Sequence, residues 1–71
     1  MSKANKKREP YIKFYMFLKE NEIPQAEIAE LLKKSVSAVN QNINGTGGDL
    51  TVSEVTKICM NYGISAEKYF F

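Results

Sequence analysis

The chain has 71 residues, with 44% hydrophobic side chains, 25% charged side chains and a formal net charge of +2. This length allows one globular domain, near the lower limit for a self-sufficient core. No apolar run approaches the roughly 18 residues that a membrane span needs, so we expect no association with a membrane. The basic N-terminus lacks the apolar stretch of a secretory signal, and one cysteine excludes an internal disulfide. These features favour a cytoplasmic protein.

Histidine is absent from the chain, and cysteine occurs once. A Ser–His or Cys–His catalytic pair is therefore impossible, and a metal cluster lacks its usual ligands. No segment marks a deep pocket, which usually needs a longer chain than this. We therefore expect a protein that is not an enzyme, with no metal, no cofactor and no small-molecule substrate.

The positive charge is concentrated at the N-terminal end. Residues 1–9 carry a net charge of +3, from Glu9 and four basic side chains: Lys3, Lys6, Lys7 and Arg8. Residues 10–71 carry six lysines and seven acidic residues, a net charge of −1. We interpret residues 1–9 as a basic flexible arm and residues 10–71 as the folded domain. The arm has two interpretations, contact with DNA phosphates or a solvated tail that only improves solubility.

Helix-breaking and helix-capping residues divide the folded part into five predicted helices, at residues 10–21, 25–33, 36–44, 52–61 and 66–70. Pro10 fits the first turn of a helix, because its missing N–H would be unpaired there. Pro24 ends the first helix by pushing Ile23 out of helical geometry. The other boundaries are set by hydroxyl N-caps and closing glycines: Ser35, Thr51 (in a capping box with Glu54), Ser65, Gly45 and Gly63.

Apolar residues recur at steps of three and four, which predicts one buried face on each helix. The expected inward residues are Phe14, Phe17, Leu18, Ile28, Ala29, Leu32, Val39, Ile43, Val55, Ile58, Cys59, Tyr62 and Tyr69. Residues 45–50 are expected to form a flexible loop, and no strand pattern occurs, so the predicted fold class is all-α. Ile12, Tyr15 and Met16 lie outside these faces. Either another protein chain covers them, or residues 69–71 fold over them.

The third predicted helix has a polar face. Ser37, Asn40, Gln41 and Asn44 fall within an arc of about 100° on a helical wheel, with Val36 at its edge. Asn and Gln side chains can pair with adenine through two hydrogen bonds, and a valine can touch the methyl group of thymine. This face is typical of a helix that reads bases in the major groove. The alternative is an ordinary solvated side of a helix.

The segment QAEIAELLKKSVSAVNQNING, residues 25–45, resembles the helix-turn-helix of the lambda-repressor-like family, the Cro and repressor type. Gln25 matches the residue that opens the first motif helix, touches a phosphate and supports the recognition helix in that family. Ala29 matches the small residue at which the two helices cross. The recognition-helix pattern is matched by Ser35, Ser37, Val39, Gln41 and Gly45. The segment TVSEVTKICMNYGISAEKYF, residues 51–70, is similar to the fourth and fifth helices of the family.

The resemblance implies a five-helix lambda-repressor-like domain that binds a double-stranded DNA operator, with the third helix in the major groove. It implies a transcription regulator of a phage or mobile-element genetic switch, acting in a bacterial host cell. In size and style the chain resembles small lytic-switch regulators of phages of low-GC Gram-positive bacteria. Such domains usually bind paired half-sites as homodimers. The expected DNA or partner contacts are Gln25, Lys34, Val36, Ser37, Asn40, Gln41 and Asn44, with Lys3, Lys6, Lys7 and Arg8 at phosphates.

The chain departs from this family at the expected phosphate contacts. Family members often have Lys or Arg after the closing glycine, but residues 46–49 are Thr-Gly-Gly-Asp, and residues 36–44 contain no cation. Phosphate contacts must then come from Lys33, Lys34 and the arm. The alternative function is that of an antirepressor, which uses its helix-turn-helix surface to bind the DNA-binding domain of a partner repressor.

Overall fold

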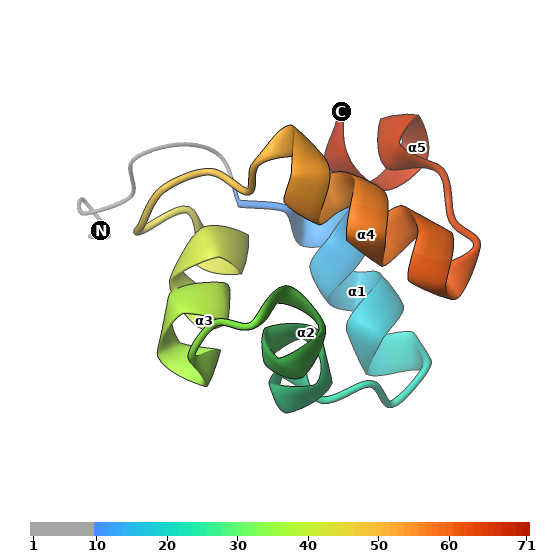
Figure 1. Cartoon of the computed structure of the whole chain (residues 1–71). Helices are drawn as coiled ribbons and strands as arrows, with labels where there is room; N and C mark the ends of the chain where they lie inside the picture. The colour runs from blue at the N-terminus through green and yellow to red at the C-terminus, as the bar shows by residue number, and fades with distance from the viewer. Residues whose placement is uncertain (1–9) are drawn as a thin grey trace.

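The computed structural model describes residues 10–71, and this part of the chain is all-helical (Figure 1). The five helices are α1 (Ile12–Glu20), α2 (Gln25–Leu32), α3 (Val36–Asn44), α4 (Val52–Tyr62) and α5 (Ala66–Phe70). They pack into a small bundle with a radius of gyration of 11.6 Å. None of these helices combines the length and the apolar character needed to cross a membrane. The predicted all-α class with five helices is confirmed.

The predicted caps form as expected. The Ser35 hydroxyl accepts a hydrogen bond from the Ala38 N–H at 3.0 Å, which satisfies one of the N–H groups left unpaired at a helix start. Thr51 and Glu54 form a complete capping box, with distances of 3.0 and 3.1 Å. Ser65 caps α5 in the same way as Ser35 caps α3. These side-chain contacts fix the starts of three helices.

The start of α1 differs from the prediction. The helix begins at Ile12, and Pro10 lies before it rather than in its first turn. Tyr11 occupies the N-cap position with a ψ angle of 73°, and its N–H donates to the Ile43 carbonyl at 2.9 Å. A tertiary contact to the end of α3 therefore sets where α1 begins.

The other helix ends lie within one residue of their predicted positions. The first helix ends at Glu20, because Asn21 caps it by donating its side-chain amide to the Phe17 carbonyl at 2.8 Å. The second helix ends at Leu32, since Lys33 adopts the left-handed conformation with a φ angle of 59°. The fourth helix continues to Tyr62 before Gly63 closes it.

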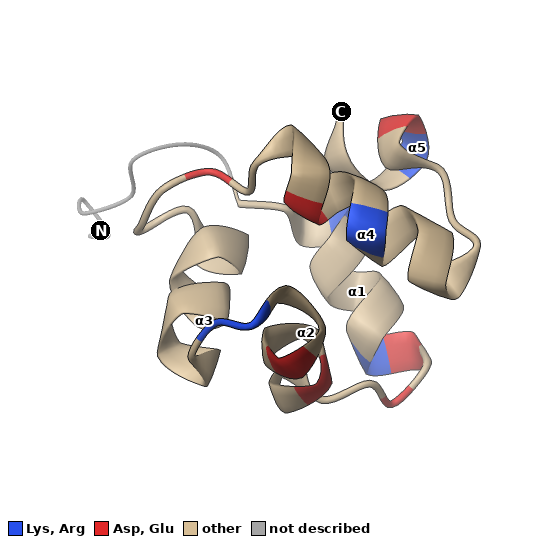
Figure 2. Ribbon diagram, viewed as in Figure 1, with Lys and Arg blue, Asp and Glu red and all other residues tan. Residues whose placement is uncertain are grey.

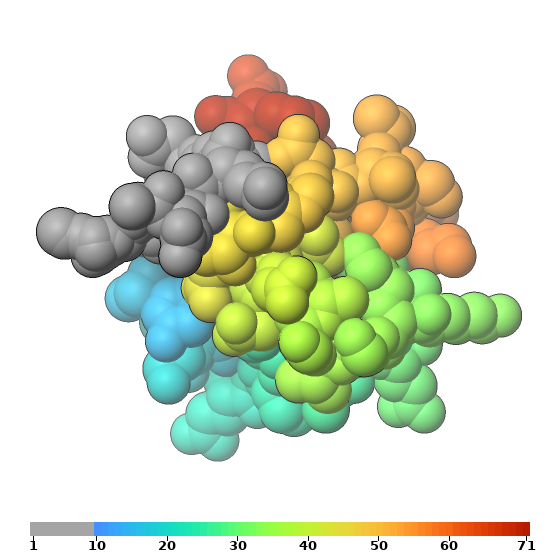
Figure 3. Space-filling view, turned by 90° about the vertical axis from the view of Figure 1, so that its left-hand side faces the viewer, coloured from blue at the N-terminus to red at the C-terminus, as the bar shows by residue number. Residues whose placement is uncertain are grey.

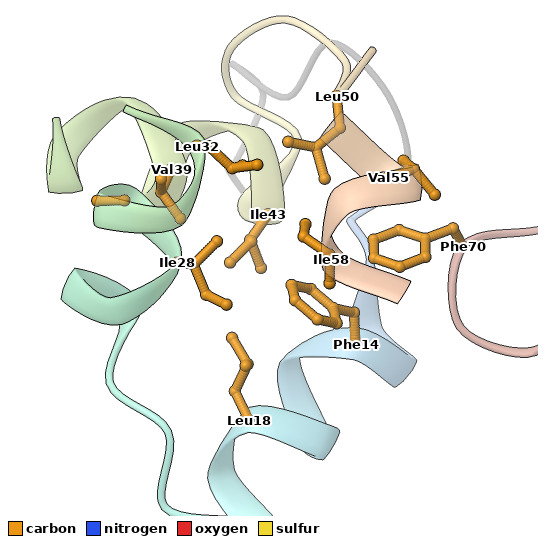
Figure 4. Packing of buried hydrophobic residues seen from close by; sticks show 11 residues of the cluster. Phe14, Leu18, Ile28, Leu32, Val39, Ile43, Leu50, Val55, Ile58 and Phe70 are labelled. Atoms are coloured by element: carbon orange, nitrogen blue, oxygen red, sulfur yellow. The ribbon is translucent and has the colours of Figure 1, made fainter. Parts of the chain in front are cut away.

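The core lies where the inner faces of all five helices meet (Figure 4). Phe14, Val39 and Ile58 are fully buried at its centre. The whole buried apolar set is Phe14, Leu18, Ile28, Ala29, Leu32, Val39, Ile43, Leu50, Val55, Ile58 and Phe70. Most of these residues were predicted from helical periodicity. Leu50 and Phe70 were not predicted, whereas Phe17, Cys59, Tyr62 and Tyr69 are only partly buried.

The C-terminal helix covers one side of α1. The Phe70 ring packs 4.8 Å from the Phe14 ring, measured between centroids, and the Tyr69 ring packs 5.3 Å from the Phe17 ring. It leaves the other apolar residues of α1 largely uncovered, since Ile12 remains 60% exposed and Met16 47% exposed. The prediction that residues 69–71 fold over Ile12, Tyr15 and Met16 is therefore wrong.

Candidate functional site: the outer face of α3

The third helix lies at the edge of the bundle, and in the view turned by 90° it occupies the centre of the facing surface (Figures 1 and 3). Its inner face is fixed by Val39 and Ile43, which are 0% and 1% exposed. A short connection, residues 33–35, joins it to α2, and the two helices pack against each other. This packing directs the opposite face of α3 outward.

The outer face of α3 presents the residues that the sequence predicted for it. Ser37, Asn40 and Gln41 are exposed, and Asn44 is partly buried. Val36, at the edge of the face, is 48% exposed. The prediction of a polar outward row and an apolar inward pair is therefore confirmed in its geometry.

Three side-chain amides on this surface form a hydrogen-bonded chain. The Asn40 Nδ2 donates to Gln25 Oε1 at 3.3 Å, and the Asn44 Nδ2 donates to Asn40 Oδ1 at 2.9 Å. Gln25 is the first residue of α2, so this chain connects the start of α2 with the exposed face of α3. Asn40 keeps further hydrogen-bonding capacity, because an amide has two N–H donors and an oxygen with two lone pairs.

Gln41 lies where α3 meets the loop that follows it. Its backbone carbonyl accepts from the N–H groups of Gly45, Thr46 and Gly47, at 3.0, 3.1 and 3.2 Å. Gly45 takes the left-handed conformation with a φ angle of 82°, which a glycine adopts without the steric cost of a Cβ. The loop therefore turns back over the last turn of α3, beside the Gln41 side chain.

A groove of about 380 Å³ runs along one side of the amide chain. One wall comes from the start of α1 and includes Ile12 and Tyr15, which are 60% and 38% exposed. The other wall includes Gln25, Asn40 and Asn44. The groove thus places an apolar wall beside three amides, and it lies next to the outer face of α3.

The charge distribution around this face is uneven (Figure 2). Residues 35–48, which include all of α3, contain no charged side chain. Lys33 and Lys34 lie in the turn before α3, whereas α2 presents two exposed acids, Glu27 and Glu30. Lys33 and Lys34 are therefore the cations nearest to α3 along the sequence.

Lys34 is bound within the protein. Its Nζ donates to Asn42 Oδ1 and forms an ion pair with Glu54 at 3.2 Å. Its side chain is only 22% exposed. Burial raises the pKa of Glu54, but the Thr51 N–H and the Lys34 ammonium outweigh this effect and hold the pKa below its ordinary value of 4.5. A phosphate at Lys34 would therefore compete with Asn42 and Glu54 for the ammonium.

Asn42 is a structural residue that the sequence analysis missed. It is 6% exposed, the only buried polar residue among those described, and its Nδ2 donates to the Gly48 carbonyl at 2.7 Å. A buried amide that lacks hydrogen bonds is costly, so these contacts are what allow asparagine here. The available signal was its position on the helical wheel, about 60° from the inward Val39 and away from the polar face.

The 45–50 loop is correspondingly better fixed than predicted. Hydrogen bonds to the Gln41 carbonyl hold its start, the Asn42 side chain holds Gly48, and Leu50 is 8% exposed in the core. The expectation of a flexible loop did not include these contacts, because a short glycine-rich sequence does not reveal the tertiary contacts that its residues make.

The remaining predictions concern residues and contacts away from this face. The predicted arm contacts, Lys3, Lys6, Lys7 and Arg8, lie outside the described residues. Residues 10–71 contain no cluster of three or more potential metal ligands. Cys59 is only partly buried, and this burial raises the pKa of its thiol.

No family model, curated protein or solved structure matches the chain in any of the three comparisons.

Proposed function

We propose that this protein is a sequence-specific DNA-binding transcription regulator, with α2 and α3 acting as a lambda-repressor-like helix-turn-helix. The observation that carries the proposal is the row of exposed Ser37, Asn40 and Gln41 on a helix whose other face is anchored in the core. In this arrangement α3 would enter the major groove and α2 would cross the DNA backbone. The regulator would serve a genetic switch of the phage type that the sequence resembles.

The chemistry of the face fits base recognition. A carboxamide presents a donor and an acceptor side by side, which matches the N7 and N6 groups of adenine. Asn40 and Gln41 therefore favour adenine, and the exposed Val36 could contact a thymine methyl group. Each well-formed pair of this kind discriminates by about 1–3 kcal/mol against the wrong base. The bond from Asn40 to Gln25 supports this chemistry by limiting the orientations of one of the two readers.

Phosphate contacts on this proposal come mainly from Lys33 and the basic arm. Lys34 contributes less, because its ammonium is already bound to Asn42 and Glu54. With five cations at phosphates, log K should fall with log salt concentration with a slope of about −4.5. Lys33→Gln should reduce the magnitude of that slope by about one unit, whereas Lys57→Gln on α4 should leave it unchanged.

The second candidate function is an antirepressor that binds the DNA-binding domain of a partner repressor. The specific observation in its favour is the absence of charge along residues 35–48, next to a groove with exposed Ile12 and Tyr15. Apolar and amide groups side by side are typical of a protein interface, whose centre is depleted in charge and enriched in aromatic residues. On this alternative the amides of α3 would bond to protein groups rather than bases.

A selection experiment separates the two functions. The full-length chain is incubated at low salt with duplexes that have randomised centres, and the bound fraction is recovered and sequenced. Enrichment of a common sequence by the wild-type chain, but not by Gln41→Ala, supports the DNA-binding function. Recovery without enrichment contradicts it. Binding of the chain to the DNA-binding domain of a repressor encoded beside it, in the absence of DNA, would then support the antirepressor.

A further inference from the structure

We propose that Gly47 is a positioning residue for Gln41. The missing side chain at residue 47 lets the loop after α3 lie directly against the Gln41 side chain and so restricts where its carboxamide points. The consequence for specificity rests on the proposed function of the α3 face. The contact itself involves only described residues of this chain, so it can be tested without any binding partner.

The argument begins with the space around Gly47. A Cβ built on Gly47 would lie 2.9 Å from Gln41 Cβ and 3.1 Å from Gln41 Oε1. The first distance is shorter than Cβ atoms show in packed proteins, and the second is tight, so any residue other than glycine must displace the loop or Gln41. The described glycines with a positive φ angle are Gly45 and Gly63. Close approach to Gln41, rather than an unusual backbone angle, therefore accounts for glycine at residue 47.

The loop has little freedom to retreat from Gln41. On one side of Gly47, the backbone N–H groups of residues 45–47 converge on the Gln41 carbonyl. On the other side, the Gly48 carbonyl accepts from the buried Asn42, and Asn42 is bound to Lys34. The loop is thus fastened both before and after the point of contact. A larger residue at 47 strains the loop against Gln41 Cβ, which the backbone of α3 holds in place, and it also pushes on Gln41 Oε1, whose exposed carboxamide then turns away.

Gly48 supplies a matched control one residue away. A Cβ built on Gly48 meets no atom within 4 Å. Gly47→Ala and Gly48→Ala make the same chemical change in the same loop and restrict the unfolded chain equally. A difference between the two variants therefore reports the contact with Gln41 rather than a general effect of replacing glycine.

The contact is tested first by NMR spectroscopy on the free protein. We expect nuclear Overhauser effects between the Gly47 α protons and the side-chain protons of Gln41. We also expect Gly47→Ala to shift the Gln41 side-chain amide resonance, while Gly48→Ala leaves it near its wild-type position. Equal effects of the two variants on this resonance would overturn the inference, whatever the protein binds.

The consequence is tested by binding to a duplex obtained in the selection described above. We expect Gln41→Ala to weaken binding about tenfold, as for one paired base contact. Gly47→Ala should weaken it several-fold and relax the base preference at one position, while Gly48→Ala should bind like wild type. In a Gln41→Ala background, Gly47→Ala should have a smaller effect. Should the selection yield no duplex, the DNA-binding function fails, and the NMR result still decides the role of Gly47.

Discussion

The ammonium of Lys34 lies 3.2 Å from the carboxylate of Glu54, so the turn before α3 is joined to the first turn of α4. Glu54 also completes the capping box of α4 through the Thr51 N–H. One carboxylate thus serves both a helix cap and a tertiary ion pair. This places Lys34 in the structural framework behind the α3 face and leaves Lys33 as the exposed lysine of the turn.

Replacing each turn lysine in turn should show that Lys34 stabilises the fold and that Lys33 does not. Lys34→Ala removes a partner from Asn42 and from Glu54, and we expect it to lower the free energy of unfolding by about 1–2 kcal/mol. Lys33→Ala should change the unfolding free energy by less than about 0.5 kcal/mol, because the side chain is exposed. Urea denaturation followed by circular dichroism measures both values. Equal stability losses would contradict the structural role of Lys34.

Glu54 should make the stability depend on acid pH. Its pKa is lower in the folded protein than its ordinary value of 4.5, since the Thr51 N–H and Lys34 outweigh the effect of burial, which acts in the opposite direction. A lowered pKa stabilises the fold above about pH 4.5, and that contribution is lost as the pH falls through the folded-state pKa. Denaturation between pH 3 and 6 should therefore show a smaller acid-dependent loss in Glu54→Gln than in the wild type. Parallel pH profiles would contradict this role.

Asn42 and Asn40 offer the same substitution on opposite faces of α3. Asn42→Ala should lower the unfolding free energy by about 1–3 kcal/mol, because it removes a buried amide bonded to Gly48 and Lys34. Asn40→Ala should change it by less than about 0.5 kcal/mol, because its amide contacts are exposed. Asn40→Ala should instead impair binding. Thermal and urea denaturation of the pair would reveal the difference, and a larger stability loss in Asn40→Ala would refute it.

The Tyr62 hydroxyl donates to Glu27 at 2.5 Å and joins α4 to α2. Burial, together with this hydrogen bond and the charge of Glu27, raises the pKa of Tyr62 to about 12 from an ordinary value of 10. The unfolded chain therefore loses this proton at a lower pH than the folded protein does. Stability should fall as the pH rises from about 10 to 12. In Tyr62→Phe the free energy of unfolding at neutral pH should be slightly lower. The fall in stability that Tyr62 causes between about pH 10 and 12 should be missing from the measured pH profile.

Much of the fold could be predicted from local sequence. The caps at Ser35, Thr51 and Ser65 and the closing glycines act within one or two turns of a helix, so their residues stand close together in the chain. Helical periodicity likewise predicted buried positions such as Val39 and Ile43. The polar face of α3 was predicted from the same helical periodicity, because the residues that anchor a helix in the core define which side faces out.

The features that the sequence did not predict depend on contacts between distant segments. The start of α1 is set by a bond from Tyr11 to Ile43 rather than by Pro10. The binding of Lys34 to Glu54 spans the whole of α3, and periodicity alone carries no information about such a pair. The same holds for Leu50, whose burial depends on how the loop returns over the core. In the candidate site, sequence therefore predicted the exposed amides but not which cation is held internally.

The most direct test of the α3 face as a DNA reader is an equilibrium titration by fluorescence anisotropy, at low salt. The wild type, Gln41→Ala and the control Thr56→Ala, at an exposed position of α4, are each titrated onto a selected duplex and a scrambled one. We expect the wild type and Thr56→Ala to prefer the selected duplex, and Gln41→Ala to lose about tenfold of that preference while binding the scrambled duplex equally well. Equal affinities of the wild type for both duplexes, or an unchanged preference in Gln41→Ala, would contradict DNA recognition by this face.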